Sequence, residues 1–409
     1  MNLTAFFGLL GGLLVLAFVA NRQYRRTRVP DVIVLLAVGL LLGPGLGLLK
    51  AQQFQQVTHA FGALAIILIL FEGGLELNLR ETLRHFPGGL VFGFLAYAMS
   101  LGLISLVVRG VLQVPWLSAL LAGAVMGCVS SSIVLPVLQQ LKLREPVRVT
   151  LLIEASLGDV LAVLTVSVLL DFADGGGSVL GSLVGGFMAK MGVSLLLAVL
   201  TGWLWSRLLP WLSEQRFWNV LTLSAVLLLY AGAELAHASG LIAVLGFGLV
   251  LSNFPGIDRR VVESAIGAEA VSPEHHQRVL TFHSELAFLV RTFFFVLLGV
   301  VVEFKGLRGY AALGLGALGA LIVARWLAVR LSQWAWKSFD ALEHEVILWM
   351  MPRGLITAVL AIQVFQERGE EFGYLPALTF AIILATNLFL LIAGLRAQRA
   401  QAPAEGLAP

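Results

Sequence analysis

Asp159 and Glu154 are the two residues whose chemistry stands out most clearly in this sequence. Both lie in the segment 151–170, which is otherwise apolar and long enough to cross a lipid bilayer. A carboxylate in the middle of a membrane span costs about 2.5–3.5 kcal/mol, so proteins commonly keep one there for a cavity, an ion pair or an ion path. Two such residues in one span indicate transport of an ion.

The spacing of the two acids predicts different roles for them. They are five residues apart, which is about 140° around a helix with 3.6 residues per turn, so they face different neighbours. Ser156 precedes Asp159 by three residues and shares its face. A structural ion pair is the alternative role for either acid, and it suits Glu154 better than Asp159.

Two arginines in apolar segments offer partners for these acids. Arg325 lies in the middle of the segment 319–328, and Arg353 lies between Pro352 and Gly354. A buried arginine stays protonated and needs an anion nearby. The simplest pairing joins Glu154 to one of the two arginines and leaves Asp159 free to titrate.

Two spans carry residues that interrupt a helix. In the segment 127–136, Ser130, Ser131 and Ser132 precede a proline, and in 351–357 a proline and a glycine flank Arg353. The two interruptions occupy corresponding places in the two halves of the chain, which is typical of an inverted-repeat transporter whose site lies where half-helices meet. Freed carbonyls and serine hydroxyls there can replace the water around a cation. The alternative is a proline kink healed by serine hydroxyls.

Other candidate signals are weaker. Glu72 either lines the route of the cation or anchors a helix end, and Arg291 is expected to make structural contacts. The glycines of 314–319 match a dinucleotide-binding pattern, but they lie inside an apolar span, where close helix packing explains them better. The sequence has no zinc-protease, Walker or cysteine-rich metal motif. We therefore expect no enzyme, no cofactor and no ATP-driven pump.

The elements that position these residues are apolar spans. Of the 409 residues 59% are hydrophobic and 12% are charged, against about 45–50% and about 25% in soluble domains. The apolar runs are continuous and not alternating, which favours an all-α polytopic membrane protein over a β-barrel and gives no reason to expect a nucleic acid partner. Cys128 is the single cysteine, so no disulfide within the chain is expected. We predict thirteen spans, at 3–20, 30–49, 59–78, 88–109, 115–139, 147–170, 184–210, 217–237, 240–254, 278–303, 309–335, 343–365 and 374–396.

The positive charges predict the orientation. An N-terminus outside places most of the 27 lysines and arginines in cytoplasmic loops or span ends, with the C-terminus in the cytoplasm. We expect a multi-pass protein of the cell membrane, plasma or inner, that contacts membrane lipid.

Five motifs together resemble the monovalent cation:proton antiporter superfamily over nearly the whole chain. They are Phe71-Glu-Gly-Gly-Leu75, Glu154-Ala-Ser-Leu-Gly-Asp159, the segment 239–253 from Ser239 to Asn253, the segment 291–299 from Arg291 to Gly299, and Pro352-Arg-Gly354. The resemblance implies a thirteen-helix inverted-repeat fold, with two discontinuous helices that cross near the membrane midplane, and a homodimer.

The resemblance also implies a division of the chain into moving parts. A single transporter unit is expected over residues 1–399, followed by a short cytoplasmic tail at 400–409. Within this unit a core would move against a dimerisation domain. The expected core is 88–170 and 309–396, the dimerisation domain is 1–78 and 217–303, and the helix that links them is 184–210.

Several positions match the motifs of this superfamily. Asp159 matches its ion- and proton-binding aspartate, Glu154 the acid that pairs with an arginine in the electroneutral branch, and Arg325 that branch's arginine. Arg353 matches the arginine of the second broken helix.

Three positions depart from the pattern. Gly158 stands where the superfamily usually has Asn or Asp, and Ala155 where the electroneutral branch often has a serine ligand. In the first broken helix, Ser130, Ser131 and Ser132 stand where the superfamily has a Thr-Asp pair. This serine run resembles the sequence of the glutathione-gated potassium efflux relatives.

These observations predict exchange of a monovalent cation, Na⁺ in preference to K⁺, for H⁺ in a 1:1 electroneutral antiport through Asp159. The expected alternatives are an electrogenic exchanger or K⁺ efflux carrier, a cation channel, and a carrier of organic anions bound by arginines. The structural ion pair in the core is expected to involve Glu154, Arg325 and Arg353. The expected ligands of the cation and the proton are Asp159, which would hold the metal ion, with Ser130, Ser131, Ser132, Ser156 and Glu72.

Overall fold

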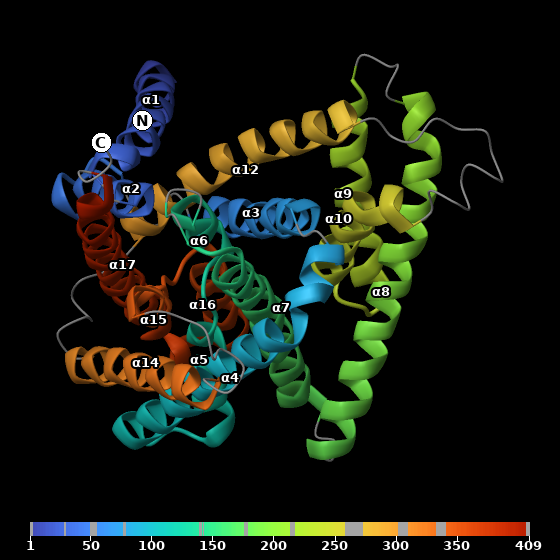
Figure 1. Ribbon diagram of the computed structural model, residues 1–409. Coiled ribbons are helices and arrows are strands. Elements are labelled where there is room, and N and C mark those ends of the chain that lie inside the picture. Colours follow the sequence, from blue (N-terminus) through green and yellow to red (C-terminus); the bar gives the residue numbers. More distant parts are fainter. Residues whose placement is uncertain are drawn as a thin grey trace. The chain divides into compact units, whose positions relative to one another are not determined.

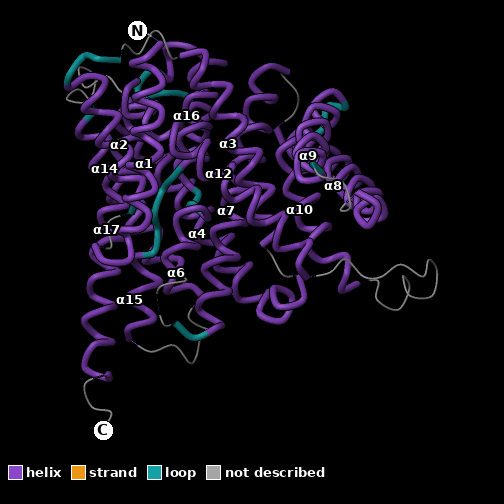
Figure 2. The backbone as a smooth tube through the Cα atoms, turned by 90° about the horizontal axis from the view of Figure 1, so that it is seen from above, coloured by secondary structure: helices purple, strands orange, loops and turns teal. Residues whose placement is uncertain are grey.

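The chain folds as an all-helical protein in the computed structural model (Figure 1). No strand occurs among the described residues, and Figure 2 shows helices and connecting loops there. This confirms the predicted all-α class. The structure describes residues 3–27, 30–49, 55–76, 79–138, 141, 143–175, 179–212, 217–257, 273–301, 310–332 and 341–405.

Long apolar helices account for most of the described chain. Seven are long and apolar enough to cross a membrane, and further apolar helices are shorter. The predicted number of thirteen spans therefore stays a prediction. The seven are Gly88–Leu112, Trp116–Val134, Glu145–Ala173, Met188–Leu208, Trp218–Leu235, Arg278–Val301 and Ala311–Ser332. The shorter ones are Leu10–Ala20, Asp31–Gly45, Ala60–Leu75, Gly240–Asn253 and Leu375–Leu391.

The helices form two compact units, each with its own packing. The first unit spans Met1–Gly62, His85–Leu170 and Arg291–Pro409, and the second spans Ala63–Arg84 and Asp171–Val290. The first unit holds all or most of α1 (Leu3–Thr27), α2 (Asp31–Leu40), the π-helical η1 (Leu41–Gly45), α4 (Leu79–Leu112), α5 (Trp116–Gly127), α6 (Ser131–Leu138), α7 (Glu145–Gly175), α14 (Ala311–Ser332), α15 (Ala341–Trp349), α16 (Leu355–Arg368), the 3₁₀ turn η4 (Gly369–Phe372) and α17 (Leu375–Glu405). The second holds most of α3 (Gln55–Glu76), with α8 (Val179–Leu212), α9 (Trp218–Leu235) and α10 (Gly240–Ile257). Helix α12 (Pro273–Val301) contributes residues to both.

The core of the second unit contains packed aromatic rings among aliphatic side chains. Phe71 of α3 lies against Phe247 of α10, with ring centroids 5.3 Å apart, and against the ring of His283 at 4.9 Å. Gly74 and Gly248 bring α3 and α10 into backbone contact, because a β-carbon on Gly74 would lie 3.1 Å from the Gly248 Cα. Small residues thus allow the close helix packing that membrane proteins commonly use.

Two helices of the first unit are broken, as the sequence predicts. Residues 128–130 separate α5 from α6, and residues 350–354 separate α15 from α16. The two breaks cross, because the Ser130 N–H donates to the Pro352 carbonyl at 2.9 Å. Gly354 lies at the same contact, where an added β-carbon would be 2.7 Å from the Ser130 Cβ. The crossing needs a residue without a side chain there.

Pro136 does not break the first of these helices, since it lies inside α6. A proline has no N–H to donate to the carbonyl four residues earlier, which here is that of Ser132. The guanidinium of Arg291 donates to this carbonyl at 3.1 Å and thereby satisfies it.

Helices α2 and α12 hold Arg291 in place. A β-carbon on Gly39 would lie 2.8 Å from the Gly299 Cα, so the two backbones touch. Arg291 also donates to the Asp31 carboxylate at the start of α2, at 3.1 Å. Arg291 therefore makes the structural contacts expected of it and links α2, α6 and α12.

Candidate functional site

Asp159 lies on α7 beside the crossing of the two broken helices. The Ser131 hydroxyl donates to its Oδ2 at 2.7 Å, and the Ser131 backbone N–H lies 3.4 Å from the same oxygen. Ser131 is the first residue of α6, so the carboxylate meets the positive end of a helix dipole. The other oxygen, Oδ1, is buried and has no hydrogen-bond partner among the described residues. Ser131 thus engages one oxygen of Asp159, and the other has no hydrogen-bond partner among the described residues.

The three consecutive serines have different contacts. Ser131 contacts Asp159, whereas Ser130 uses its backbone for the crossing. The hydroxyls of Ser130 and Ser132 lie 3.1 Å apart. The structure thus brings Ser131 to the carboxylate, and the roles of Ser130 and Ser132 as ligands stay predictions.

The proposed roles of Ser156 and Glu72 as ligands of the cation and the proton also stay predictions. Ser156 is half-buried on α7, three residues before Asp159. Glu72 is half-buried on α3 and belongs to the second unit.

Cys128 lies near Asp159 and contacts Thr357. The Cys128 Sγ lies 3.4 Å from the Thr357 Oγ1, and both residues are buried. Cys128 and Arg353 each interact electrostatically with Asp159. The thiol and the Thr357 hydroxyl thus add polar groups, one from each broken helix, that were not among the predicted site residues.

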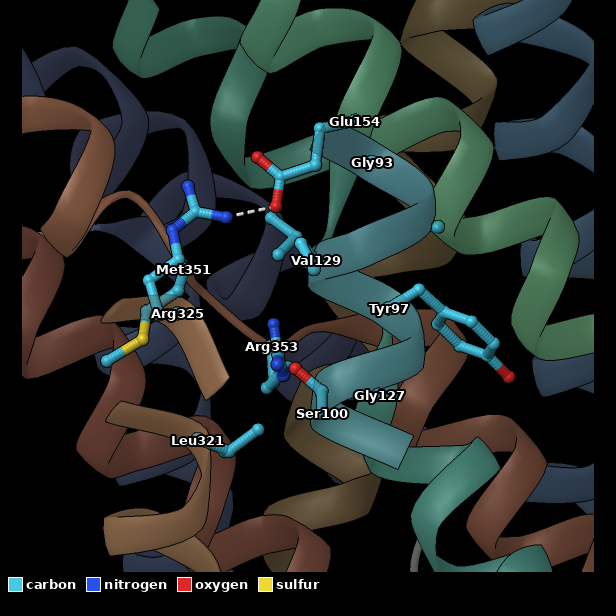
Figure 3. Close-up of a pocket in the computed structure, with 12 residues that line it drawn as sticks. Gly93, Tyr97, Ser100, Gly127, Val129, Glu154, Leu321, Arg325, Met351 and Arg353 are labelled. Atoms are coloured by element: carbon cyan, nitrogen blue, oxygen red, sulfur yellow. Dashed lines mark hydrogen bonds and ion pairs between the residues drawn. The ribbon is translucent and has the colours of Figure 1, made fainter. Parts of the chain in front are cut away.

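Glu154 pairs with Arg325, one of the two arginines that the sequence offers as its partner (Figure 3). Arg325 comes from α14, and its other donors reach the carbonyls of Ile347 at 2.8 Å and Met350 at 2.7 Å. These carbonyls belong to the end of α15, where a cation satisfies unpaired groups and complements the helix dipole. The guanidinium also lies 4.8 Å from the Phe92 ring centroid. Arg325 therefore holds α7, α14 and α15 together.

Arg353 is as buried as Glu154 and Asp159, with each of these side chains 2% exposed. Its backbone is held by α17, because its N–H donates to the Thr386 hydroxyl at 3.0 Å and its carbonyl accepts from the Asn387 amide at 2.9 Å. Its Nε and Nη1 have no hydrogen-bond partner in the described part of the chain. The guanidinium interacts electrostatically with both Glu154 and Asp159.

Thr386 and Asn387 are positioning residues that were not predicted from the sequence. They are adjacent polar residues in the middle of the predicted span 374–396. A buried amide in a membrane span needs partners. That signal alone would have marked them as candidates for holding backbone at the second break.

The arrangement suits binding of one small cation or one proton. A buried carboxylate with an open oxygen, at a crossing where helices are interrupted, can be neutralised by either species but not by both at once. Glu154 is already neutralised by Arg325. Asp159 therefore stays the candidate binding group, as the sequence predicts.

Comparison with known proteins identifies the family. The chain is similar to the "K(+)/H(+) antiporter NhaP2" of Shewanella oneidensis, with 27% identity over 88% of this chain and 61% of the relative. It is also similar to the "Na(+)/H(+) antiporter 1" of Methanocaldococcus jannaschii, with 26% identity over 95% of this chain and 90% of the relative. The chain thus spans about three fifths of the length of NhaP2 relatives.

A solved structure and a family model each match most of the chain. The solved structure of the sodium proton antiporter MjNhaP1 from Methanocaldococcus jannaschii at pH 8 matches with a TM-score of 0.78 and 22% identity, over 98% of both chains. The model of the family described as "Sodium/hydrogen exchanger, transmembrane" matches residues 13–399. The chain therefore belongs to the transmembrane sodium/hydrogen exchanger family.

Proposed function

We propose that this protein is a secondary antiporter that exchanges a monovalent cation, Na⁺ in preference to K⁺, for H⁺. The observation that carries the proposal is the Asp159 carboxylate, buried at the crossing with one oxygen on Ser131 and the other available. Relatives named as Na⁺/H⁺ and K⁺/H⁺ antiporters support cation–proton exchange. The preference for Na⁺ is part of the proposal.

The proposed mechanism is competition for one carboxylate. Burial favours the neutral form of an acid, so in the absence of a cation Asp159 holds a proton. A dehydrated cation bound to the carboxylate, the Ser131 hydroxyl and backbone carbonyls displaces this proton. If the site opens to one side of the membrane at a time, exclusive occupancy gives exchange. The predicted core and dimerisation domains of a homodimer would provide this motion.

The ion pair supports the proposed 1:1 stoichiometry. Arg325 neutralises Glu154, so Asp159 alone changes its protonation during the cycle. One H⁺ then moves for each cation, and the exchange is electroneutral.

Purified protein in liposomes tests this function directly. Proton flux is measured with Li⁺, Na⁺, K⁺ and Rb⁺ gradients in turn, with and without an imposed membrane potential. We expect flux with Na⁺ above that with K⁺, unchanged by the potential. Strong voltage dependence would reject the 1:1 stoichiometry, and the absence of flux with every cation would reject the antiporter.

A K⁺/H⁺ exchanger is the second candidate, and the naming of the NhaP2 relatives favours it. Flux with K⁺ above that with Na⁺ in the same experiment would select it. A channel would be selected by rates far above those of a carrier.

A further inference from the structure

A small cavity lies beside the crossing of the two helix breaks, inside the first unit. It has a volume of about 10 Å³ and is lined by residues of α4, α7 and α14 and of both helix breaks. Every residue that lines it is buried. Glu154 and Gly158 face it from successive turns of α7, whereas Asp159 faces Ser131. Asp159 is thus not among the residues that line the cavity.

Unsatisfied polar atoms come from residues that line this cavity. Glu154 uses Oε1 for Arg325, and its buried Oε2 has no hydrogen-bond partner among the described residues. Arg353 lines the same cavity with Nε and Nη1 unpartnered in the described chain. Figure 3 shows Arg353, Glu154 and the hydroxyl of Ser100 around this space. The residues that carry this acceptor and these donors therefore line one cavity.

The size and chemistry of the cavity fit one ligand. A buried water needs about 10–15 Å³ and two to four polar partners, and buried polar groups without a partner are unfavourable. We propose that the cavity is a water-binding site, in which one water accepts from Arg353 and donates to Glu154 Oε2. Arg325, Glu154, the water and Arg353 then form one hydrogen-bonded chain.

This water has a consequence for transport, which rests on the proposed function. Arg353 interacts electrostatically with both Glu154 and Asp159. The water attaches the guanidinium to Glu154 and keeps it off Asp159. Without the water, the buried Arg353 guanidinium would be stabilised most by pairing with Asp159. It would then occupy the carboxylate as a fixed cation. The water thus keeps the binding group available for a mobile ion.

Substitution of Gly158, which lines the cavity, can test the water site. A β-carbon there would lie 3.5 Å from the Val129 nitrogen and 3.7 Å from the Cys128 Cα, which is ordinary contact. Gly158→Ala therefore places a methyl group at the cavity without a clash. Gly158→Ser places a hydroxyl one turn from Glu154, on the same face of α7, where it can replace the water. Gly319→Ala on α14 is the matched control, because nothing lies within 4 Å of its β-carbon.

The experiment has a structural and a functional measurement. An experimental map of the wild-type protein that resolves ordered water should show one water between Glu154 and Arg353. Gly158→Ala should lose this density and lower the apparent affinity for the cation about tenfold, since Arg353 then competes for Asp159. Gly158→Ser and Gly319→Ala should keep the wild-type affinity.

Two results would overturn the proposal. One is a wild-type map in which the cavity is dry or holds density too large for water. The other is a folded Gly158→Ala variant with wild-type affinity. The map decides the proposal even if Gly158→Ala fails to fold or the wild type transports nothing, so the failure of the antiporter and that of the water site are distinguishable.

Discussion

At the scale of single residues, two carboxylates on one helix have opposite environments. Glu154 is neutralised by Arg325, and Asp159 keeps an oxygen without a described partner. The sequence predicts that they face apart, because a separation of five residues is a matter of helix geometry. The sequence did not indicate which of three serines reaches Asp159, or that Thr386 holds Arg353. Those contacts depend on how distant segments cross, and no local pattern contains that.

Replacement of Asp159 by asparagine tests the binding group. An amide of the same size keeps the hydrogen bond from Ser131 but neither carries the negative charge nor takes up the proton. We expect Asp159→Asn to abolish cation-dependent proton flux in liposomes while the protein purifies with wild-type thermal stability. Full activity of this variant would remove Asp159 from the proposed role.

Replacement of Glu154 by glutamine tests the ion pair. It leaves the Arg325 guanidinium buried without an anion, and breaking a buried pair in this way costs about 3–5 kcal/mol. We expect Glu154→Gln to lower the melting temperature and the yield of folded protein. The exposed Glu367 provides a control, because Glu367→Gln should change stability by no more than about 0.5 kcal/mol. Wild-type stability of Glu154→Gln with lost transport would instead make Glu154 a ligand of the ion.

At the scale of elements, the site depends on where helices stop. The sequence predicts both interruptions from serine, glycine and proline, and the first one lies before Pro136. That proline lies inside α6, and Arg291 satisfies the carbonyl that the proline leaves free. A proline is tolerated in a helix when a neighbouring side chain takes over the lost hydrogen bond. The element that supplies Arg291 is far away in the sequence.

Arg291 should therefore affect transport through α6. Its guanidinium donates to the Asp31 carboxylate and to the Ser132 carbonyl. Ser132 directly follows Ser131, whose hydroxyl donates to Asp159. Arg291→Met should reduce both the exchange rate and thermal stability, because it removes both donors. Arg291→Lys, which has charge but no planar fork, should recover stability better than exchange. Equal recovery of both by lysine would mean that charge alone matters at this position.

Gly354 tests the crossing itself. The β-carbon of Gly354→Ala would press on the Ser130 Cβ and lie 3.0 Å from the Ile133 Cδ1, so the two breaks must move apart. We expect this variant to lose exchange and to melt at a lower temperature, whereas Gly319→Ala leaves both unchanged. Normal flux in Gly354→Ala would mean that the breaks tolerate separation and that the site does not depend on their contact.

At the scale of the whole molecule, composition and continuous apolar runs were enough to predict the class of fold. The number of spans and their direction are harder to derive, because short apolar helices such as Gly240–Asn253 fall below the length of a full span. The distribution of lysine and arginine supplies independent information, since cytoplasmic loops retain positive charge. It predicts the N-terminus outside and the C-terminus in the cytoplasm.

Cysteine labelling in intact cells tests this orientation. The native Cys128 is 1% exposed, so the wild-type chain should not react with a membrane-impermeant maleimide and serves as its own background. A cysteine introduced at Asn2, before the first predicted span, should be labelled from outside, and one at Ala404 only after the membrane is opened. Labelling of Ala404→Cys in intact cells, with Asn2→Cys protected, would reverse the orientation. It would also place the positive loops outside, against the charge rule on which the orientation depends.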